Sequence, residues 1–248
     1  SPAVTLNAGP LTIDDVVSVA RFGGAVRVGP KAVAAMKRSR GVVERRLRDG
    51  QAYYGLNTGF GSLAKKRIDA ADLATLQRNL VRSHAAGVGE PLREELVRAM
   101  MLILAGSLSR GLSGVRPVVV ETIVAMLNAG ITPVVPSIGS VGASGDLAPL
   151  AHVALALIGE GRVTTRNGQM AKGPKGQMKR REEGGVPAAA ALKRAGIAPL
   201  ELGAKEGLAL INGTHLMCAL RRALQGRARL RDLLRRRPDG GRERGGVE

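Results

Sequence analysis

Apolar side chains recur at helical spacing along most of the chain. Thr12 precedes the run I-D-D-V-V, which predicts a capped helix with acidic residues in its first turn, ending at Gly23. Strand-like alternation is confined to short pieces such as residues 4–6. The pattern therefore predicts a mainly α fold. The further helices are expected at residues 31–49, 69–81, 92–108, 117–128, 146–158 and 202–220, with Pro91 in the first turn of the 92–108 helix.

Two of these helices are apolar on nearly every side. The run M-M-L-I-L at residues 100–104 leaves no polar face, so we expect the helix to be surrounded by protein. The longest apolar stretch, residues 147–159, contains Pro149 and His152 and is too short to span a bilayer, so no membrane partner is expected. Both helices are therefore expected to be buried against neighbouring helices.

The chain has one cysteine, Cys218, in the apolar run L-M-C-A-L. A single cysteine excludes an internal disulfide and a cysteine-based zinc site, and it fits a reducing compartment. The N-terminus shows no basic-then-apolar leader. We therefore expect a cytoplasmic protein without a metal, in which Cys218 is a buried thiol.

The net charge of +18 is unevenly distributed. Residues 162–194 contain nine basic and two acidic side chains, and residues 219–248 contain ten basic and four acidic ones. Together they carry 13 of the 18 charges. Basic proteins bind nucleic acid adventitiously, but proteins that stack bases need aromatic side chains, which are only 2% of this chain. No specific nucleic-acid partner is expected.

Composition also divides the chain into parts. Residues 1–220 read as one portion of a domain, interrupted at 165–185 by a glycine- and lysine-rich stretch that predicts a mobile basic insert. In residues 221–248 arginine dominates and the apolar period fades. This tail is either a basic arm or a sequence that has lost its proper continuation.

Three segments combine glycine with small polar residues more densely than packing requires. They are residues 54–61 (Y-G-L-N-T-G-F-G), residues 82–89 (R-S-H-A-A-G-V-G) and residues 136–152 (P-S-I-G-S-V-G-A-S-G-D-L-A-P-L-A-H). None matches a phosphate-binding loop, a dinucleotide fingerprint or the G-x-S-x-G nucleophile elbow. By itself His84 is more often a structural residue, and the 54–61 segment a structural turn.

The third segment resembles the signature of the aromatic amino-acid ammonia-lyases, in which Ala-Ser-Gly cyclises into 4-methylideneimidazol-5-one. Here the tripeptide is Ala143, Ser144 and Gly145. Cyclisation needs the amide nitrogen of Gly145 to attack the carbonyl carbon of Ala143, and Ser144 then loses water. Residues 54–61, the helix L-Q-R-N-L-V-R-S-H-A-A-G and residues 205–214 (K-E-G-L-A-L-I-N-G-T) resemble the family's other motifs, in family order.

The resemblance implies roles for single residues. Tyr54 would be the base that removes the β-proton, Ser144 the methylidene-forming residue, and Asn212 would hold the ring or the substrate. The Ser83-His84 pair is the version found in the histidine-specific members, which implies that His84 binds the substrate imidazole. The other candidates have structural roles: Asp146 is expected to be an N-cap that orients the ring, and His152 and His215 to be structural.

The implied activity is non-oxidative elimination of ammonia from L-histidine to trans-urocanate, the first step of histidine degradation. The implied cofactor is the ring itself, formed autocatalytically, and the implied assembly is a homotetramer whose sites use several subunits. The implied fold is the N-terminal part of the ammonia-lyase helical fold, with short strands near the N-terminus and the start of a central helix bundle. Because family members are about twice this length, we expect this chain to be a truncated portion that is inactive alone. The alternatives are a phenylalanine or tyrosine ammonia-lyase or aminomutase, and a non-catalytic basic fragment that binds nucleic acid non-specifically.

Overall fold

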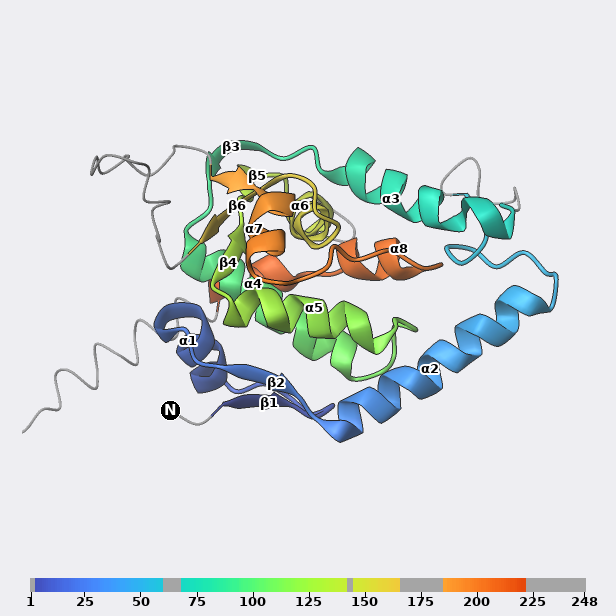
Figure 1. The fold of residues 1–248 in the computed structure, drawn as a ribbon, viewed down its shortest axis with the longest axis horizontal. Helices are drawn as coiled ribbons and strands as arrows, with labels where there is room; N and C mark the ends of the chain where they lie inside the picture. Colours follow the sequence, from blue (N-terminus) through green and yellow to red (C-terminus); the bar gives the residue numbers. More distant parts are fainter. Residues whose placement is uncertain (1–2, 60–67, 142–144, 166–184, 222–248) are drawn as a thin grey trace, which may run out of the picture.

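The structure is a computed structural model that describes residues 3–59, 68–141, 145–165 and 185–221. Most of the described chain is helical, as expected (Figure 1). The helices are α1 (Ile13–Phe22), α2 (Pro30–Arg48), the short 3-10 helix η2 (Ala70–Asp72), α3 (Leu73–His84), α4 (Glu94–Ser109), α5 (Pro117–Asn128), α6 (Leu147–Leu157), α7 (Ala188–Arg194) and α8 (Glu206–Ile211). Residues 215–221 are helical as well.

In the described residues, seven short strands form three small sheets at the edges of this helical body. They are β1 (Val4–Leu6), β2 (Val26–Val28), β3 (Val88–Pro91), β4 (Ile131–Pro133), β5 (Pro136–Ile138), β6 (Arg162–Thr165) and β7 (Val186–Pro187). β1 pairs with β2 in parallel, β3 with β5 antiparallel, and β4, β6 and β7 form an antiparallel sheet in the order β4-β6-β7. The sequence predicted β1 but not the later strands, which contain two to four residues each.

The core is built around α4. Met100, Met101, Leu102 and Leu104 are fully buried, which confirms that this helix is covered nearly all round. α1 and α5 pack directly against α4, and residues of α6 join the same cluster. A helix without a polar face gains stability only when every side meets apolar neighbours, and this packing supplies them.

The start of α1 shows why local sequence sets element boundaries. The Thr12 hydroxyl accepts a hydrogen bond from the Asp15 N–H at 3.1 Å, and the Asp15 carboxylate accepts one from the Thr12 N–H at 2.9 Å. This reciprocal pair is a capping box. Gly23 then ends the helix in the left-handed conformation with φ of 71°. Both ends of the helix are therefore as predicted.

Three expectations from the sequence are wrong. Pro91 ends strand β3 and does not begin a helix; α4 starts at Glu94, because β3 pairs with β5 and keeps Pro91 extended. The helix expected at 202–220 is two helices, separated at residues 212–214 by a segment that bonds to another part of the chain. Cys218 is exposed rather than buried.

The insert expected at 165–185 and the tail expected at 221–248 fall almost entirely outside the described residues. Within the part of the chain that the structure covers, no helix is both long and apolar enough to cross a bilayer.

α3, α6 and α8 pack against one another on the side of the molecule away from the β1–β2 pair (Figure 1). α3 carries Ser83 and His84 at its end, α6 follows the glycine-rich segment, and α8 leads to Asn212. Mutual packing of these three helices brings three of the four sequence motifs into one region.

Candidate active site

Gly145 lies at the centre of this region. It is buried and adopts φ of +75°, a conformation that disfavours every residue with a Cβ. A Cβ at this position would lie 3.2 Å from the Thr214 methyl carbon and 3.4 Å from the Met217 sulfur. Glycine is therefore required here both by the backbone angle and by the close approach of the 213–217 segment.

Two backbone hydrogen bonds hold Gly145 in place. The Val141 N–H donates to the Gly145 carbonyl at 2.9 Å, and the following residue, Asp146, donates its N–H to the Gly213 carbonyl at 3.1 Å. Gly145 and Gly213 thus form an isolated parallel bridge. The glycine-rich segment and the motif that contains Asn212 are joined at this bridge. Ala143 and Ser144 lie outside the described residues.

Asp146 connects the same two segments through its side chain, which is fully buried. Its carboxylate accepts hydrogen bonds from the backbone N–H groups of Leu216 at 2.7 Å and Met217 at 3.1 Å, and from the Ser140 hydroxyl at 2.8 Å. Asp146 precedes α6 but makes no side-chain cap to it. Asp146 therefore holds the expected N-cap position of α6, but its carboxylate caps the 215–221 helix instead, whose positive N-terminal end attracts it.

Asn212 ends α8, and its backbone N–H donates to the Leu208 carbonyl at 3.1 Å. Its side chain is exposed, directly before the Gly213–Gly145 bridge. α8 is fixed by α3: the Leu208 N–H donates to the Gln77 side-chain oxygen at 3.2 Å. Asn212 is therefore placed beside the glycine-rich segment.

His84 is the last residue of α3 and is half-buried. Its Nδ1 lies 2.9 Å from the Leu80 carbonyl oxygen. Because a carbonyl only accepts, this contact requires a proton on Nδ1, which leaves Nε2 of the neutral ring as an acceptor. The Ser83 hydroxyl donates to the same carbonyl at 3.0 Å.

The segment after α3 is attached to the glycine-rich segment. The Gly87 N–H donates to His152 Nε2 at 3.3 Å, and a Cβ on Gly139 would lie 3.3 Å from the Gly87 α-carbon. Burial lowers the pKa of His152, so the ring stays neutral and can accept this bond. His152 thus has the structural contact that was expected of it.

His215 also borders the bridge. A Cβ on Gly213 would overlap its ring, and burial lowers the pKa of His215 although the charge of Asp146 acts in the opposite direction. Its Nδ1 is buried and makes no hydrogen bond within the described part of the chain. The packing of its ring over Gly213 helps to explain why the bridge needs glycine on both sides.

Tyr54 lies in a turn after α2, and 66% of its surface is exposed. The buried Asn57 holds this turn: its side chain accepts from the Tyr53 N–H at 2.7 Å and donates to the Gln51 carbonyl at 2.7 Å. The Ile68 N–H donates to the Asn57 carbonyl, so the turn lies beside the start of α3, whereas His84 ends that helix. The hydrogen bonds of Asn57 thus attach the turn that carries Tyr54 to the residues before α3.

The hydroxyl of the neighbouring Tyr53 is held between two charged side chains. Its hydroxyl donates to the Asp49 carboxylate at 2.6 Å and accepts from the Arg46 guanidinium at 2.9 Å. The hydrogen bond to Asp49 raises the pKa of Tyr53. The hydroxyl therefore stays protonated, and little phenolate is available to accept a proton.

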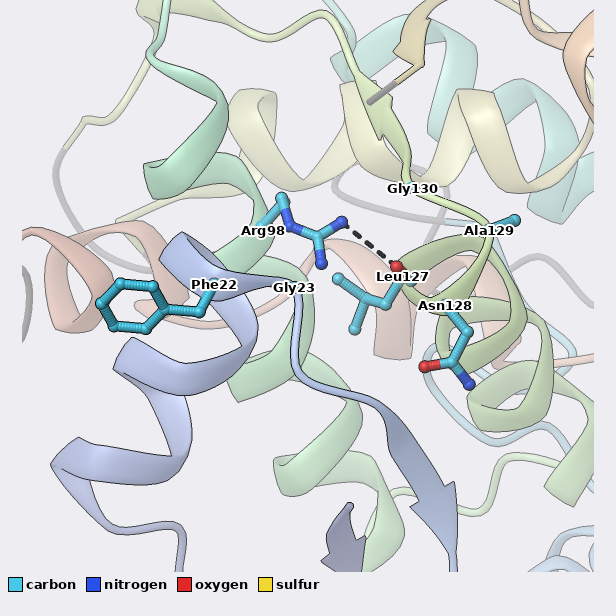
Figure 2. A pocket seen from close by; sticks show the side chains of 7 residues that line it. All are labelled: Phe22, Gly23, Arg98, Leu127, Asn128, Ala129 and Gly130. Atoms are coloured by element: carbon cyan, nitrogen blue, oxygen red, sulfur yellow. Dashed lines mark hydrogen bonds between the residues drawn. The ribbon is translucent and has the colours of Figure 1, made fainter. Parts of the chain in front are cut away.

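A separate depression of about 330 Å³ lies at the C-terminal ends of α1 and α5. It is lined by Phe22, Gly23, Arg98, Leu127, Asn128, Ala129 and Gly130 (Figure 2). The buried Arg98 guanidinium donates to the Val19 carbonyl at 3.0 Å and to the Leu127 carbonyl at 3.2 Å. A cation that bonds the last carbonyls of two helices stabilises their ends, so we assign Arg98 to the fold.

Sequence reasoning missed two residues of this region. Gln77 and Glu206 are both fully buried, polar, and attached to α8. They lie inside the quoted motifs, so a polar residue on the expected apolar face of a helix is the signal that could have found them. In the described residues no group of three or more histidine, cysteine or carboxylate side chains is arranged to hold a metal ion.

The fold and the joined motifs define a protein class, and the comparison with family models agrees. Residues 11–235 match the aromatic amino acid lyase family, and the chain belongs to that family. It is 49% identical over 217 residues to histidine ammonia-lyase of Geobacillus thermodenitrificans and 50% identical over 219 residues to that of Gloeobacter violaceus. Each match covers 88% of this chain, which spans about 40% of the length of these relatives.

Solved structures show the same likeness. Histidine ammonia-lyase from Trypanosoma cruzi superposes with a TM-score of 0.78 at 37% identity, covering 92% of this chain and 41% of that one. Tyrosine aminomutase from Streptomyces globisporus superposes with a TM-score of 0.79 at 39% identity, covering 92% of this chain and 40% of that one. The predicted fold class, a portion of the ammonia-lyase helical fold, is confirmed.

Proposed function

We propose that this chain carries part of the active site of a histidine ammonia-lyase, which eliminates ammonia from L-histidine to give trans-urocanate. The observation that carries the proposal is the Gly145–Gly213 bridge. It places the last residue of the Ala-Ser-Gly tripeptide against the segment of Asn212, with the end of α3 attached to the same loop through Gly87 and His152. The relatives by sequence named above carry the same activity in their names.

The residues present fit the prosthetic ring. Gly145 has the left-handed backbone and lacks the Cβ that would crowd the Thr214 methyl group. The hydrogen bond from the Val141 N–H to the Gly145 carbonyl joins the residues on either side of the tripeptide loop, which favours attack of the Gly145 nitrogen on the Ala143 carbonyl two positions earlier. When formed from Ala143, Ser144 and Gly145, a 4-methylideneimidazol-5-one ring supplies an electrophilic methylidene carbon to the substrate amine.

The protein's own side chains have separate tasks in this proposal. The Nε2 acceptor of His84 receives an N–H from the substrate imidazole and so orients the substrate. The exposed amide of Asn212 holds the ring or the substrate by hydrogen bonds. Tyr54 removes the β-proton, which requires its turn to approach the site in the assembled enzyme. A cytoplasmic homotetramer is part of the same proposal.

Phenylalanine and tyrosine chemistry is the second candidate, because tyrosine aminomutase has the same fold. Ser83 and His84 favour histidine: an imidazole with a free acceptor pairs with the N–H of histidine, and an aromatic ring of phenylalanine offers no such donor. Assays of active enzyme with L-histidine, L-phenylalanine and L-tyrosine in parallel separate the two candidates.

The test of the proposed chemistry is Ser144→Ala. In an active enzyme that contains these residues, we expect this variant to lose the near-ultraviolet absorbance of the ring and nearly all urocanate formation, because no β-oxygen remains to be eliminated. Ser137→Ala, at an exposed position of β5, is the matched control and should retain both. Urocanate formation by Ser144→Ala at the rate of the control would overturn the proposal.

A further inference from the structure

Glu206 is a fully buried carboxylate at the start of α8, five residues before the helix ends at Ile211. Its Oε1 accepts from the backbone N–H and from Nε of Arg116, both at 2.9 Å. Its Oε2 accepts from Arg116 Nη2 and from the Gly203 N–H, both at 2.7 Å. Arg40 Nη1 lies 3.8 Å from Oε1. Four hydrogen bonds therefore satisfy both oxygens of this carboxylate.

The same cluster of charged side chains links α2, the segment before α5 and the start of α8. Arg40, on α2, donates from Nη1 to the carbonyls of Gly114 at 3.3 Å and Ala204 at 3.0 Å. Lys205 donates from Nζ to the Ser113 carbonyl at 2.8 Å and has a backbone φ of +71°, rare for a residue with a side chain. Each of these bonds fixes the position at which α8 begins.

The place where α8 begins determines where its other end lies, beside the candidate site. Its six residues rise about 9 Å along the helix axis. Rotation about the axis is restricted because a Cβ on Gly207 would lie only 2.7 Å from the Gln77 carbonyl oxygen, and because the Leu208 N–H donates to the Gln77 side chain. The helix then ends at Asn212, next to the Gly213 carbonyl that accepts from Asp146.

The charge state of Glu206 agrees with this arrangement. Burial alone raises the pKa of a carboxyl group, but the hydrogen bonds from Arg116 and Gly203 outweigh it and lower the pKa of Glu206. The group therefore stays ionised. A buried ion pair adds little net stability compared with apolar packing, whereas it does specify one geometry, since only one arrangement satisfies all its bonds.

We propose that Glu206 is a positioning residue: through its bonds to Arg116 and Gly203 it sets the register of α8, and thereby the placement of Asn212 and of the Gly213 carbonyl against Gly145 and Asp146. That Asn212 acts on the substrate rests on the proposed function. The placement of Asn212 by Glu206 is a separate claim, because it concerns only contacts within this chain. Either claim can therefore be wrong without the other.

The test is hydrogen exchange of backbone amides in the chain of residues 1–248, comparing Glu206→Gln with Glu44→Gln. Glu44 is an exposed carboxylate that also pairs with Arg40, at 3.2 Å, and so controls for loss of one charge in the same cluster. In Glu206→Gln we expect the amides of Asp146, Leu216 and Met217 to exchange at least about tenfold faster, while amides of α4 keep their protection. Glu44→Gln should leave all of them unchanged.

Arg116→Lys is the second variant, because it keeps the charge and removes only the fork that bonds both oxygens. It should accelerate the same amides by a smaller factor. In a preparation that turns over L-histidine, Glu206→Gln should lower kcat about tenfold with KM within about twofold, as expected when a group acts only through the geometry of another. Unchanged exchange at residues 146, 216 and 217, or equal acceleration throughout the chain in both variants, would overturn the positioning role, whether or not histidine is the substrate.

Discussion

The carboxylate of Asp146 accepts a hydrogen bond from the Leu216 backbone N–H at 2.7 Å, across 70 positions of the sequence. One residue thus ends the glycine-rich segment and also caps a helix that begins near Asn212. Because the bond is charge-assisted and its acceptor is fully buried, it restrains the two segments more firmly than packing of small residues alone. The cap that Asp146 makes to the 215–221 helix therefore joins the two segments of the candidate site.

Replacing Asp146 by alanine should lower the free energy of unfolding by about 2 kcal/mol, because two helix N–H groups and the Ser140 hydroxyl lose their acceptor. The measurement is chemical denaturation. Asp72→Ala is the matched control, since Asp72 also precedes a helix but makes no side-chain cap, and it should change stability by less than about 0.5 kcal/mol. Equal effects of the two substitutions would show that the Asp146 cap is unimportant.

Gly145→Ala should destabilise the chain more than Gly196→Ala does. Both glycines have positive φ, of +75° and +68°, so both substitutions carry a backbone cost of about 1 kcal/mol. A Cβ at Gly196 meets open space, whereas one at Gly145 meets Thr214 and Met217. We expect a further loss of about 1 kcal/mol at Gly145 from this crowding, measured by thermal unfolding. Equal losses would contradict the close approach of the two segments.

Stability should decline as the pH falls from 7 toward 5, and His152 should contribute to the decline. Burial lowers the pKa of His152, so the unfolded chain binds a proton near pH 6.5 while the folded chain resists it. The contribution is therefore fully present above the ordinary histidine pKa and is lost as the pH falls toward the lowered one.

Protonation of His152 also removes the acceptor for the Gly87 N–H. His152→Gln retains an acceptor but does not titrate, so denaturation curves of this variant should change less between pH 7 and pH 5 than those of the parent chain. If both show the same pH dependence, the buried neutral state of His152 is not responsible.

His84→Leu should reduce kcat/KM for L-histidine on the order of 100-fold in active enzyme, because leucine offers no acceptor for the substrate imidazole. The effect on thermal unfolding should be small, since the side chain is only half-buried and leucine is a good helix former. Steady-state kinetics and a melting curve on the same preparation check both parts. A large loss of stability with unchanged kcat/KM would return His84 to a structural role.

Residues 1–248 by themselves should form no urocanate. Large apolar side chains near the bridge are exposed, among them Val141 and Met217, at 70% and 53%. A site that excludes water needs these groups covered. Urocanate formation by this chain alone, followed by absorbance, would show that the described residues suffice.

The sequence alone determined the α class, the ends of α1 and the buried character of α4, because each depends on residues within a few positions of one another. It also indicated the glycine-rich segment and the Asn212 motif, since the residue types needed for the chemistry are adjacent in the chain. The positions of Tyr54, His84, Ser144 and Asn212 followed from the same motifs.

Only the tertiary structure decided how these motifs meet. The break at residues 212–214 exists because the Gly213 carbonyl bonds to Asp146 and not within a continuous helix. Pro91 became a strand residue through pairing with β5, and the carboxylates of Asp146 and Glu206 found their donors 70 and 90 positions away along the chain. Local propensity does not contain these partners; they are set by the packing of α3, α6 and α8, where a buried polar group must bond to whatever donor the fold brings within reach.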